Sequence, residues 1–323
     1  MVSNCTETTG IRFVLQDGVV GGLENRLMTV GEQGKEMREQ NTLSGLWAVF
    51  ISIFAAGAAF AGEGIENLET VGKPTPGGTG FQPAATELAR DVQWLDGMIN
   101  IVIASIVLFV VILLAIVAIR YNRRANPDPA RFTHHTPIEV AWTVVPIIIL
   151  VFIGAFSLPV LFKQQIIPEA DVTIKVTGNQ WYWSYEYVDY NFGFDSFLLE
   201  RDQLEEYGYN PDEYLLATDT AVVIPVGKTI VMQVTASDVI HSWTIPAFGV
   251  KQDGVPGRLA ELWFTAEREG VYFGQCSELC GKDHAYMPIT VKVVSEEAYR
   301  KWLDGAIEEY AGTPRNVIVA SNN

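Results

Sequence analysis

Two long runs without a charged residue constrain the fold more than any other feature of this 323-residue chain. The first run covers residues 98–119 and the second covers residues 140–162, so they are 22 and 23 residues long. A helix needs about 20 apolar residues to cross the hydrocarbon core of a bilayer, and buried helices of soluble proteins rarely stay apolar for that length. The sequence therefore predicts two membrane-spanning helices in a hairpin over residues 94–163.

The loop between these runs indicates which side of the membrane each flanking segment faces. The loop is short and basic, with Arg120, Arg123, Arg124 and Arg131 against Asp128 and Glu139. Short loops rich in Lys and Arg stay on the cytoplasmic side of a membrane. We therefore expect a multi-pass protein of a bacterial inner membrane, with both flanking segments on the periplasmic side.

A third apolar run, residues 46–61, is only 16 residues long and ends in the small-residue triplet Ala59-Phe60-Ala61. With a basic start at Met37-Arg38, this pattern predicts a signal peptide over residues 37–61; a short extra membrane helix is the alternative. Residues 1–36, which include Cys5, form an N-terminal extension to which we assign no role. Residues 62–93 contain GKPTPGGTG, which is typical of a flexible periplasmic linker.

Residues 164–311 have the pattern of a β-domain. Short runs rich in β-branched and aromatic residues, such as TAVVIPVGKTIVMQVTA and MPITVKVV, alternate with polar positions and are separated by Gly, Pro or Asp. This spacing predicts an antiparallel sandwich or barrel rather than β-α-β units. The polar segment 201–218 predicts an insertion loop with a helical turn, and residues 295–311 have helical spacing after Ser295. Residues 312–323 form a C-terminal tail.

The acidic residues concentrate outside the hairpin. The chain has a formal net charge of −16, and residues 163–323 contain 24 Asp and Glu against 12 Lys and Arg. This balance excludes a nucleic-acid partner, because phosphates require Lys and Arg. It is consistent either with an ordinary solubilising surface or with a face that attracts a basic protein.

The segment CSELCGKDHAYMP, residues 276–288, holds a dense set of metal-binding side chains. Cys276, Cys280, His284 and Met287 all carry soft or borderline ligands. One other histidine follows the hairpin in the sequence, His241, which lies 35 residues before Cys276 in DVIHSWTIP. The combined pattern is H-x34-C-x3-C-x3-H-x2-M.

Three chemistries compete for this cluster. Two thiols outside the cytoplasm can form a Cys276–Cys280 disulfide, but a disulfide leaves His284 and Met287 unexplained. Zinc binds thiolate and imidazole but seldom a thioether. A Met that completes a set of Cys and His ligands indicates copper. The second cysteine allows two thiolates to bridge two copper ions, an arrangement suited to electron relay.

Four motifs resemble those of subunit II of the haem-copper cytochrome c oxidases, the subunit that bears the dinuclear copper centre CuA. They are TPIEVAWTVVP, GNQWYWSYEY, DVIHSWTIPAFGVKQDGVPGR and GQCSELCGKDHAYMP, within roughly residues 90–310. The resemblance implies a two-helix transmembrane hairpin plus an all-β, cupredoxin-like barrel or sandwich. It also implies that electrons pass from cytochrome c through CuA to haem in subunit I of a proton-pumping oxidase, where oxygen is reduced to water.

The same resemblance implies the metal ligands. The implied copper ligands are His241, Cys276, Cys280, His284, Met287 and the backbone carbonyl of Glu278. The Glu278 side chain is implied as a ligand of a magnesium or manganese ion shared with subunit I, and a carboxylate suits such a hard cation. From the residues alone, Glu278 is better explained as a solvated loop acid.

The remaining implied roles concern electron and proton transfer. Trp181 is implied as the exposed residue that receives the electron, and Glu139 as the entrance of a proton path into subunit I. The acids implied to dock cytochrome c are Glu186, Asp189, Asp195 and Asp238. Oxidase subunits I and III and membrane lipid are the other implied partners. Without the resemblance, Trp181 would be assigned to the core and Glu139 to the membrane interface.

Two functions from other classes remain open at this point. A membrane-anchored protein that stores or delivers copper could use the same ligands, although delivery sites tend to be exposed and to have few ligands. A structural barrel with a Cys276–Cys280 disulfide would bind no metal. Copper content and redox behaviour separate these alternatives from electron transfer.

Overall fold

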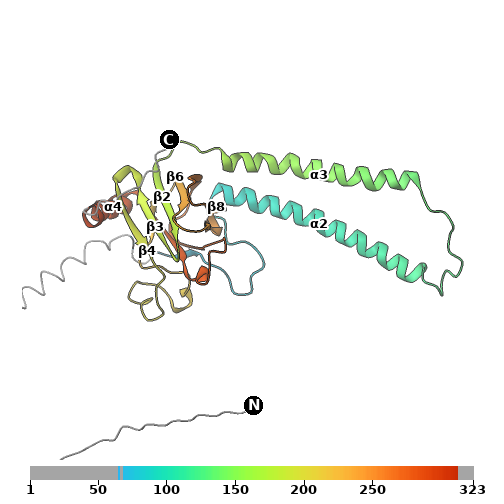
Figure 1. Cartoon of the computed structure of the whole chain (residues 1–323), viewed down its shortest axis with the longest axis horizontal. Helices are drawn as coiled ribbons and strands as arrows, with labels where there is room; N and C mark the ends of the chain where they lie inside the picture. The colour runs from blue at the N-terminus through green and yellow to red at the C-terminus, as the bar shows by residue number, and fades with distance from the viewer. Residues whose placement is uncertain (1–64, 66–67, 312–323) are drawn as a thin grey trace, which may run out of the picture. The chain divides into compact units, whose positions relative to one another are not determined.

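The structure, a computed structural model, describes residue 65 and residues 68–311 (Figure 1). The predictions for the N-terminal extension with Cys5, for the signal peptide and for the C-terminal tail fall on residues outside this part of the chain. The described residues form a short strand, a helical hairpin, the remaining strands of a β-domain and a final helix.

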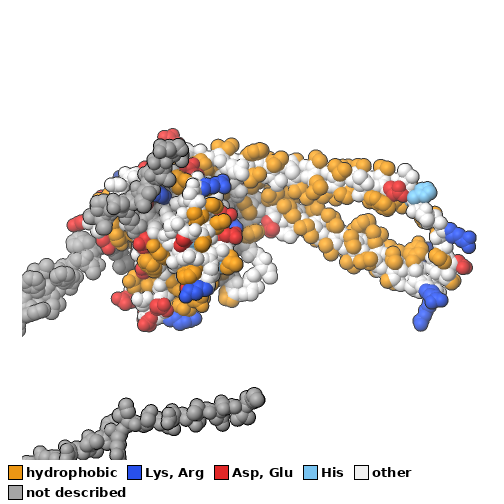
Figure 2. Space-filling view, viewed as in Figure 1, with side chains coloured by type: hydrophobic (Ala, Val, Ile, Leu, Met, Phe, Trp, Pro, Cys, Tyr) orange, Lys and Arg blue, Asp and Glu red, His pale blue; other side chains and the backbone are white. Residues whose placement is uncertain are grey.

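Two long helices contain the two apolar runs. Helix α2 extends from Glu87 to Arg120 and helix α3 from Thr136 to Gln165, and each is long and apolar enough to cross a membrane. Exposed hydrophobic side chains follow one another along residues 101–119 of α2 and 138–162 of α3, and basic side chains gather at the loop that connects the helices (Figure 2). Such a continuous apolar surface requires lipid or protein around it rather than water.

The first turns of α2 belong to the β-domain. We predicted a flexible linker over residues 62–93, but the helix begins at Glu87, and Leu88 and Ala89 are buried. Gly249, with φ of +68°, lies so close that a Cβ there would be 2.6 Å from the Cα of Ala89. The sequence did not reveal this packing, because burial against distant strands leaves no local pattern.

Polar contacts also join the helices to the β-domain. Lys163 Nζ lies 2.6 Å from a carboxylate oxygen of Glu87 and 2.6 Å from one of Asp91. The indole N–H of Trp263 donates to the carbonyl oxygen of Lys163 over 3.1 Å. Exposed ion pairs stabilise a fold only slightly, so the buried first turn of α2 is the stronger attachment.

The β-domain contains a five-stranded sheet, a four-stranded sheet and a two-stranded ribbon. The five-stranded sheet has the order β4 (Phe192–Ser196), β3 (Tyr182–Tyr187), β2 (Val172–Asn179), β6 (Thr229–Ala236) and β9 (Ala260–Thr265). The four-stranded sheet has the order β1 (Thr70–Gly72), β10 (Gly270–Gln275), β11 (Pro288–Val294) and β5 (Val222–Pro225), and the ribbon pairs β7 (His241–Ile245) with β8 (Val250–Gly254).

This all-β architecture confirms the predicted fold class, but the strands are not all antiparallel. Strand β2 pairs with β6 in parallel, and β11 pairs with β5 in parallel. Parallel neighbours need a long connection, and between β2 and β6 the chain forms β3, β4, the insertion and β5. The predicted antiparallel arrangement therefore does not extend to these two pairs, because strand spacing does not reveal such returns.

Alternating side chains build the core between the sheets. Ile174 and Val176 of β2 are fully buried, whereas the residues between them are partly exposed, as a period of two requires. Trp183, Tyr185 and Tyr187 of β3 follow the same rule and are also buried. Burying side chains of this size stabilises the domain by roughly 1.5–3 kcal/mol each.

The remaining elements cover the sheets. Helix α4 (Glu296–Tyr310) starts at Ser295, whose hydroxyl accepts a hydrogen bond from the Ala298 amide, and it buries Tyr299 and Leu303. The insertion contains the expected helical turn at Pro211–Glu213. Three further 3-10 turns are η1 (Val188–Tyr190), η3 (Pro246–Phe248) and η4 (His284–Tyr286).

Candidate metal centre

The loop that carries most of the predicted ligands closes a β-hairpin. Strand β10 ends at Gln275, directly before Cys276, and it pairs with β11 so that Gln275 lies opposite Pro288. Residues 276–287 therefore leave and re-enter the same pair of strands. This short closed path forces the side chains of the loop toward one another.

His241 reaches this loop because β7 packs closely on its neighbours. A Cβ at Gly274 would lie 1.8 Å from the carbonyl oxygen of Thr244, so only glycine fits between β7 and β10. Gly178 of β2 contacts the imidazole, and a Cβ there would be 2.7 Å from Cγ of His241. Two glycines thus make room for the histidine.

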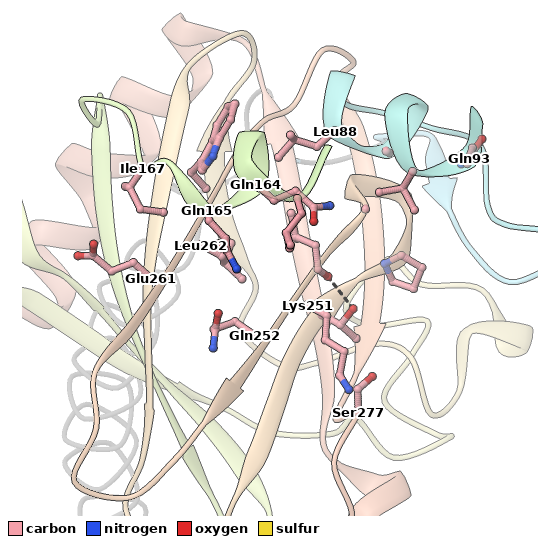
Figure 3. Close-up of a pocket in the computed structure, with 18 of the residues that line it drawn as sticks. Leu88, Gln93, Gln164, Gln165, Ile167, Lys251, Gln252, Glu261, Leu262 and Ser277 are labelled. Carbon is pink, nitrogen blue, oxygen red and sulfur yellow. Dashed lines mark hydrogen bonds between the residues drawn. The ribbon is translucent and has the colours of Figure 1, made fainter. Parts of the chain in front are cut away.

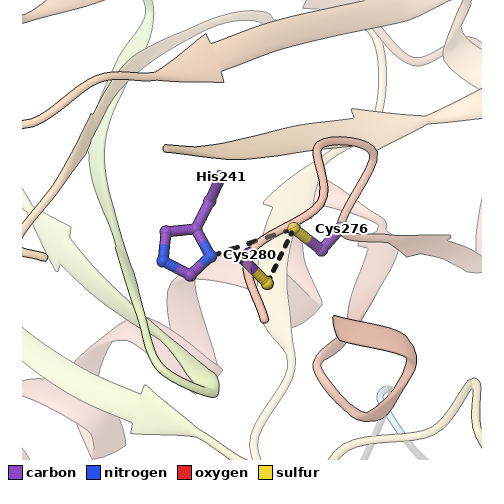
Figure 4. A group of neighbouring side chains, drawn as sticks. All are labelled: His241, Cys276 and Cys280. Carbon is purple, nitrogen blue, oxygen red and sulfur yellow. Dashed lines mark hydrogen bonds between the residues drawn. The ribbon is translucent and has the colours of Figure 1, made fainter. Parts of the chain in front are cut away.

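The donor atoms of His241, Cys276 and Cys280 all lie within 4.8 Å of one another (Figure 4). Cys276 Sγ is 3.8 Å from His241 Nδ1 and 3.9 Å from Cys280 Sγ. A disulfide requires a separation of about 2.05 Å, so both cysteines are free thiols in this arrangement.

The other three predicted donors surround the same two sulfurs. Cys280 Sγ is 3.5 Å from His284 Nδ1 and 3.5 Å from Met287 Sδ. Cys276 Sγ is 3.3 Å from the carbonyl oxygen of Glu278. Two thiols, two imidazoles, a thioether and a carbonyl are therefore close together. This donor set fits copper better than zinc, because zinc seldom takes a thioether.

The two thiols have different acidities. Burial acts to raise the pKa of Cys276, but hydrogen bonds with His241 and with the Glu278 and Ser242 backbone outweigh it and lower the pKa to about 7. Burial and the neighbouring Cys276 raise the pKa of Cys280 to about 12. Cys276 therefore gives up its proton more easily than Cys280 does.

Asp238 holds the far side of the His241 ring. Its Oδ1 lies 2.9 Å from His241 Nε2, which leaves Nδ1 directed at the thiols. A carboxylate in this position fixes the tautomer and orientation of a metal-binding histidine. Burial acts to raise the pKa of Asp238, but hydrogen bonds from His241 and two backbone amides lower it. We had assigned Asp238 only to the docking face.

Trp181 directly contacts residues 276–287, which we call the metal loop. Its indole N–H donates to the carbonyl oxygen of Cys280 over 3.3 Å, and Lys282 Nζ lies 5.5 Å from the ring centroid. Gly281, with φ of +126°, allows this approach, because a Cβ there would be 2.9 Å from the ring. The side chain is half-buried, so Trp181 is less exposed than the resemblance implied.

Trp183 also contacts the candidate site, although sequence analysis did not single it out. It is fully buried, its indole N–H donates to the Met287 carbonyl oxygen over 3.1 Å, and its ring meets the His241 ring edge-on at 5.9 Å. The alternation of β3 indicates that Trp183 is buried, but its contacts depend on pairing between distant strands.

The other predicted docking acids lie on adjacent elements and have partners within the domain. Glu186 of β3 pairs with Lys175 at 3.3 Å, and Asp195 of β4 accepts a hydrogen bond from the Ser184 hydroxyl. Asp189, in the turn between these strands, accepts from a backbone amide of β2. They are exposed or half-buried.

Two further predicted sites depend on side chains that the cluster of donor atoms does not include. Glu278 has an exposed side chain, although its backbone carbonyl faces Cys276. Glu139 lies in the first turn of α3, and its Oε1 accepts a hydrogen bond from the His135 amide over 2.8 Å. In the isolated chain, this contact satisfies a free backbone donor at the start of the helix.

A cavity of about 880 Å³ lies where α2 and α3 meet the β-domain (Figure 3). Its walls combine helix residues, such as Leu88 and Gln93, with strand residues, such as Lys251 and Leu262. It reaches the metal loop at Ser277 and includes none of the six predicted copper ligands. The cavity is therefore separate from the candidate centre.

Two family descriptions match successive parts of the chain. "Cytochrome C oxidase subunit II, transmembrane domain" matches residues 74–160, and "Cytochrome C oxidase subunit II, periplasmic domain" matches residues 172–294. The first match covers α2 and most of α3, and the second covers strands β2 to β11 with the metal loop.

Individual proteins show the same similarity. Cytochrome c oxidase subunit 2 of Cereibacter sphaeroides is 59% identical over 84% of this chain and 93% of its own length. Probable cytochrome c oxidase subunit 2 of Rickettsia bellii is 44% identical over 77% of this chain and 91% of its own. A crystal structure of the periplasmic domain of subunit II of cytochrome oxidase from Bradyrhizobium japonicum is 49% identical, with a TM-score of 0.41, over 45% of this chain and 99% of that one.

Proposed function

Because the chain belongs to the cytochrome c oxidase subunit II family, we propose that it is the electron-accepting subunit of a proton-pumping aerobic cytochrome c oxidase. In this role it takes single electrons from reduced cytochrome c and passes them to haem in subunit I, where oxygen is reduced to water. The observation that carries the proposal is the convergence of four further donor groups around two free thiols.

These donors would hold a dinuclear copper centre. Cys276, Cys280, His241, His284, Met287 and the Glu278 carbonyl would together hold the two ions. A bound copper pair supplies a one-electron carrier. The thioether and the paired thiols favour copper over harder metals.

The surrounding residues hold the ligands in place. Cys276, Cys280 and Met287 are at most 6% exposed, so the protein excludes most water from the site. Asp238 orients His241, and Trp183 holds the backbone of Met287. Ligands that are fixed before and after electron transfer need little rearrangement, which favours fast transfer.

Trp181 is the proposed electron acceptor from cytochrome c. It lies at the tip between β2 and β3, and its indole N–H contacts the backbone of a copper ligand. Glu186, Asp189, Asp195 and Asp238 would attract the basic surface of the cytochrome, because complementary charge speeds encounter. The hydrogen bond of Asp238 to His241 gives that residue a second role.

Glu278 would serve two metals through different atoms. Its carbonyl faces the thiols, and its exposed carboxylate is free to bind a magnesium or manganese ion. One carboxylate cannot complete the shell of such an ion. Subunit I and water would therefore supply the remaining ligands.

The hairpin would anchor the subunit in a bacterial inner membrane, with the copper domain on the periplasmic side. Its apolar surface would pack against lipid and subunits I and III. Glu139, at the cytoplasmic start of α3, would mark the entrance of a proton path into subunit I, because carboxylates at such positions can begin proton relays.

Electron transfer from cytochrome c tests this function. Reduced cytochrome c, mixed rapidly with the purified oxidase, should transfer electrons to a copper centre before haem is reduced. Trp181→Phe should slow this step at least tenfold, whereas Trp302→Phe on α4 should not change it. Normal transfer in the Trp181 variant, or turnover in protein lacking this copper, would contradict the proposal. A protein that only delivers copper would lose its metal to an acceptor without turnover.

A further inference from the structure

The turn between β2 and β3 contacts the metal loop through its side chains. The turn consists of Gln180 and Trp181, between Asn179 at the end of β2 and Tyr182 at the start of β3. The side-chain amide of Gln180 donates to the Cys280 carbonyl oxygen over 2.7 Å. The same oxygen accepts the 3.3 Å hydrogen bond of the Trp181 indole. A carbonyl oxygen has two lone pairs and can accept both donors.

The backbone of the same turn contacts the segment that carries the ligand His241. The Gln180 N–H donates to Asp238 Oδ2 over 2.7 Å. Oδ1 of this carboxylate lies 2.9 Å from His241 Nε2. Gln180 is therefore connected to Cys280 through its side chain and to His241 through one carboxylate.

Packing around the turn is tight. Gly281 has φ of +126°, and a Cβ there would lie 2.9 Å from the Trp181 ring and 3.2 Å from Gln180 Nε2. The metal loop therefore closes directly onto both side chains. Any side chain larger than hydrogen at position 281 would separate the turn from the loop.

We propose that Gln180 is a positioning residue that holds Trp181 against the Cys280 carbonyl and thereby sets the rate of electron transfer from Trp181 to the metal centre. This inference rests on the proposed function. Of the two hydrogen bonds to this carbonyl, that of Gln180 is the shorter. Without it, the 3.3 Å hydrogen bond of the indole would be the one hydrogen bond between this turn and the Cys280 carbonyl, and packing alone would supplement it in keeping the half-buried ring at the loop.

The side chain and the backbone of Gln180 can be separated by mutation. Gln180→Ala removes the bond to Cys280 and keeps the backbone bond to Asp238, so the ligands should stay in place. Gln180→Glu keeps the size but places a carboxylate against a carbonyl oxygen. Gln233→Ala is the matched control. It also removes a glutamine side-chain amide, which lies on β6 and donates to Glu261 on β9 over 3.0 Å.

The experiment uses the intact oxidase and a cytochrome c that carries a photoactivated reductant. It measures the rate constant of electron transfer within the docked complex, the dissociation constant and the paramagnetic resonance signal of copper. Gln180→Ala should slow transfer about two- to tenfold, as expected for loss of one hydrogen bond. Gln180→Glu should slow it at least as much. The copper signal and dissociation constant should match those of the wild type and of Gln233→Ala.

Several results would overturn the inference. Transfer in Gln180→Ala as fast as in the control would leave the proposed function intact but remove the role of Gln180. An altered copper signal would mean that Gln180 supports the ligands rather than Trp181, and a change confined to the dissociation constant would mean that it contacts the cytochrome. Wild-type oxidase that accepts no electron from cytochrome c at copper would remove both the inference and the proposed function.

Discussion

The helical hairpin and the candidate metal centre differ in how far their structures depend on contacts within the chain. Beyond the first turns of α2, most side chains of the two helices are exposed, so their surroundings must stabilise them. At the centre, by contrast, Cys276, Cys280 and His241 are buried. Cys280 is also contacted by Gln180, which lies 100 residues away in the sequence. The position of the hairpin in the chain can therefore be predicted from composition alone, whereas the centre forms only in the folded β-domain.

Removing a thiol should have the largest effect on the centre and none on the hairpin. Cys276→Ser should abolish the dicopper signal. Copper affinity should fall by more than the roughly 10- to 100-fold that removal of an outer-shell partner costs. Membrane insertion should be unchanged. Ser277→Ala, in the same loop, should keep both copper and activity. Retention of a dicopper signal in Cys276→Ser would exclude bridging by this thiolate.

A charge in the hairpin should have the converse effect. Leu108→Arg places a cation near the middle of the first apolar run and should disfavour insertion by about 3 kcal/mol. The amount of chain in the membrane should fall, while the copper signal per folded chain stays constant. Tyr207→Arg, at an exposed position of the insertion, should change neither quantity. Equal insertion of the Leu108 variant would mean that this position does not face lipid.

Removing the support of His241 should weaken the centre without abolishing it. Asp238→Asn leaves His241 Nε2 with a weaker acceptor and should lower copper affinity about 10- to 100-fold. Copper competition with a chelator measures this change. Asp304→Asn on α4 should behave as wild type. An unchanged copper affinity would show that Asp238 acts only in docking.

The metal-free protein should show the different acidities of the two thiols. The pKa of Cys276 is lowered to about 7, so the stability contributed by its thiolate is present above the usual thiol pKa and is lost as pH falls through 7. The pKa of Cys280 is raised. The stability contributed by its protonated thiol is therefore present below the usual thiol pKa and is lost as pH rises above that value. Ultraviolet absorbance of the thiolates and unfolding curves of wild type against Cys276→Ser measure both effects. Identical pH profiles would contradict this assignment.

Much of the fold follows from local patterns. The two apolar runs predicted α2 and α3 because a helix through lipid requires about 20 such residues. Alternation predicted the strands, and Ser295 marked the start of α4. The parallel pairing of β2 with β6 and the buried start of α2 were missed, because both depend on residues distant in sequence.

The candidate centre was predictable as a set of residues but not as a network. The spacing of Cys276, Cys280, His284 and Met287 in one loop indicated the donors. The contact of Asp238 with His241, and that of Trp183 with Met287, required the folded sheets. The partial burial of Trp181 follows from Gly281, whose missing side chain lets the loop approach.

Electron paramagnetic resonance of the full chain, purified in detergent, loaded with copper and assayed for metal, tests the dinuclear centre most directly. A centre bridged by Cys276 and Cys280 predicts two coppers per chain and hyperfine structure from one unpaired electron shared equally between two nuclei. A single-copper signal, or a Cys276–Cys280 disulfide that excludes copper, would contradict it.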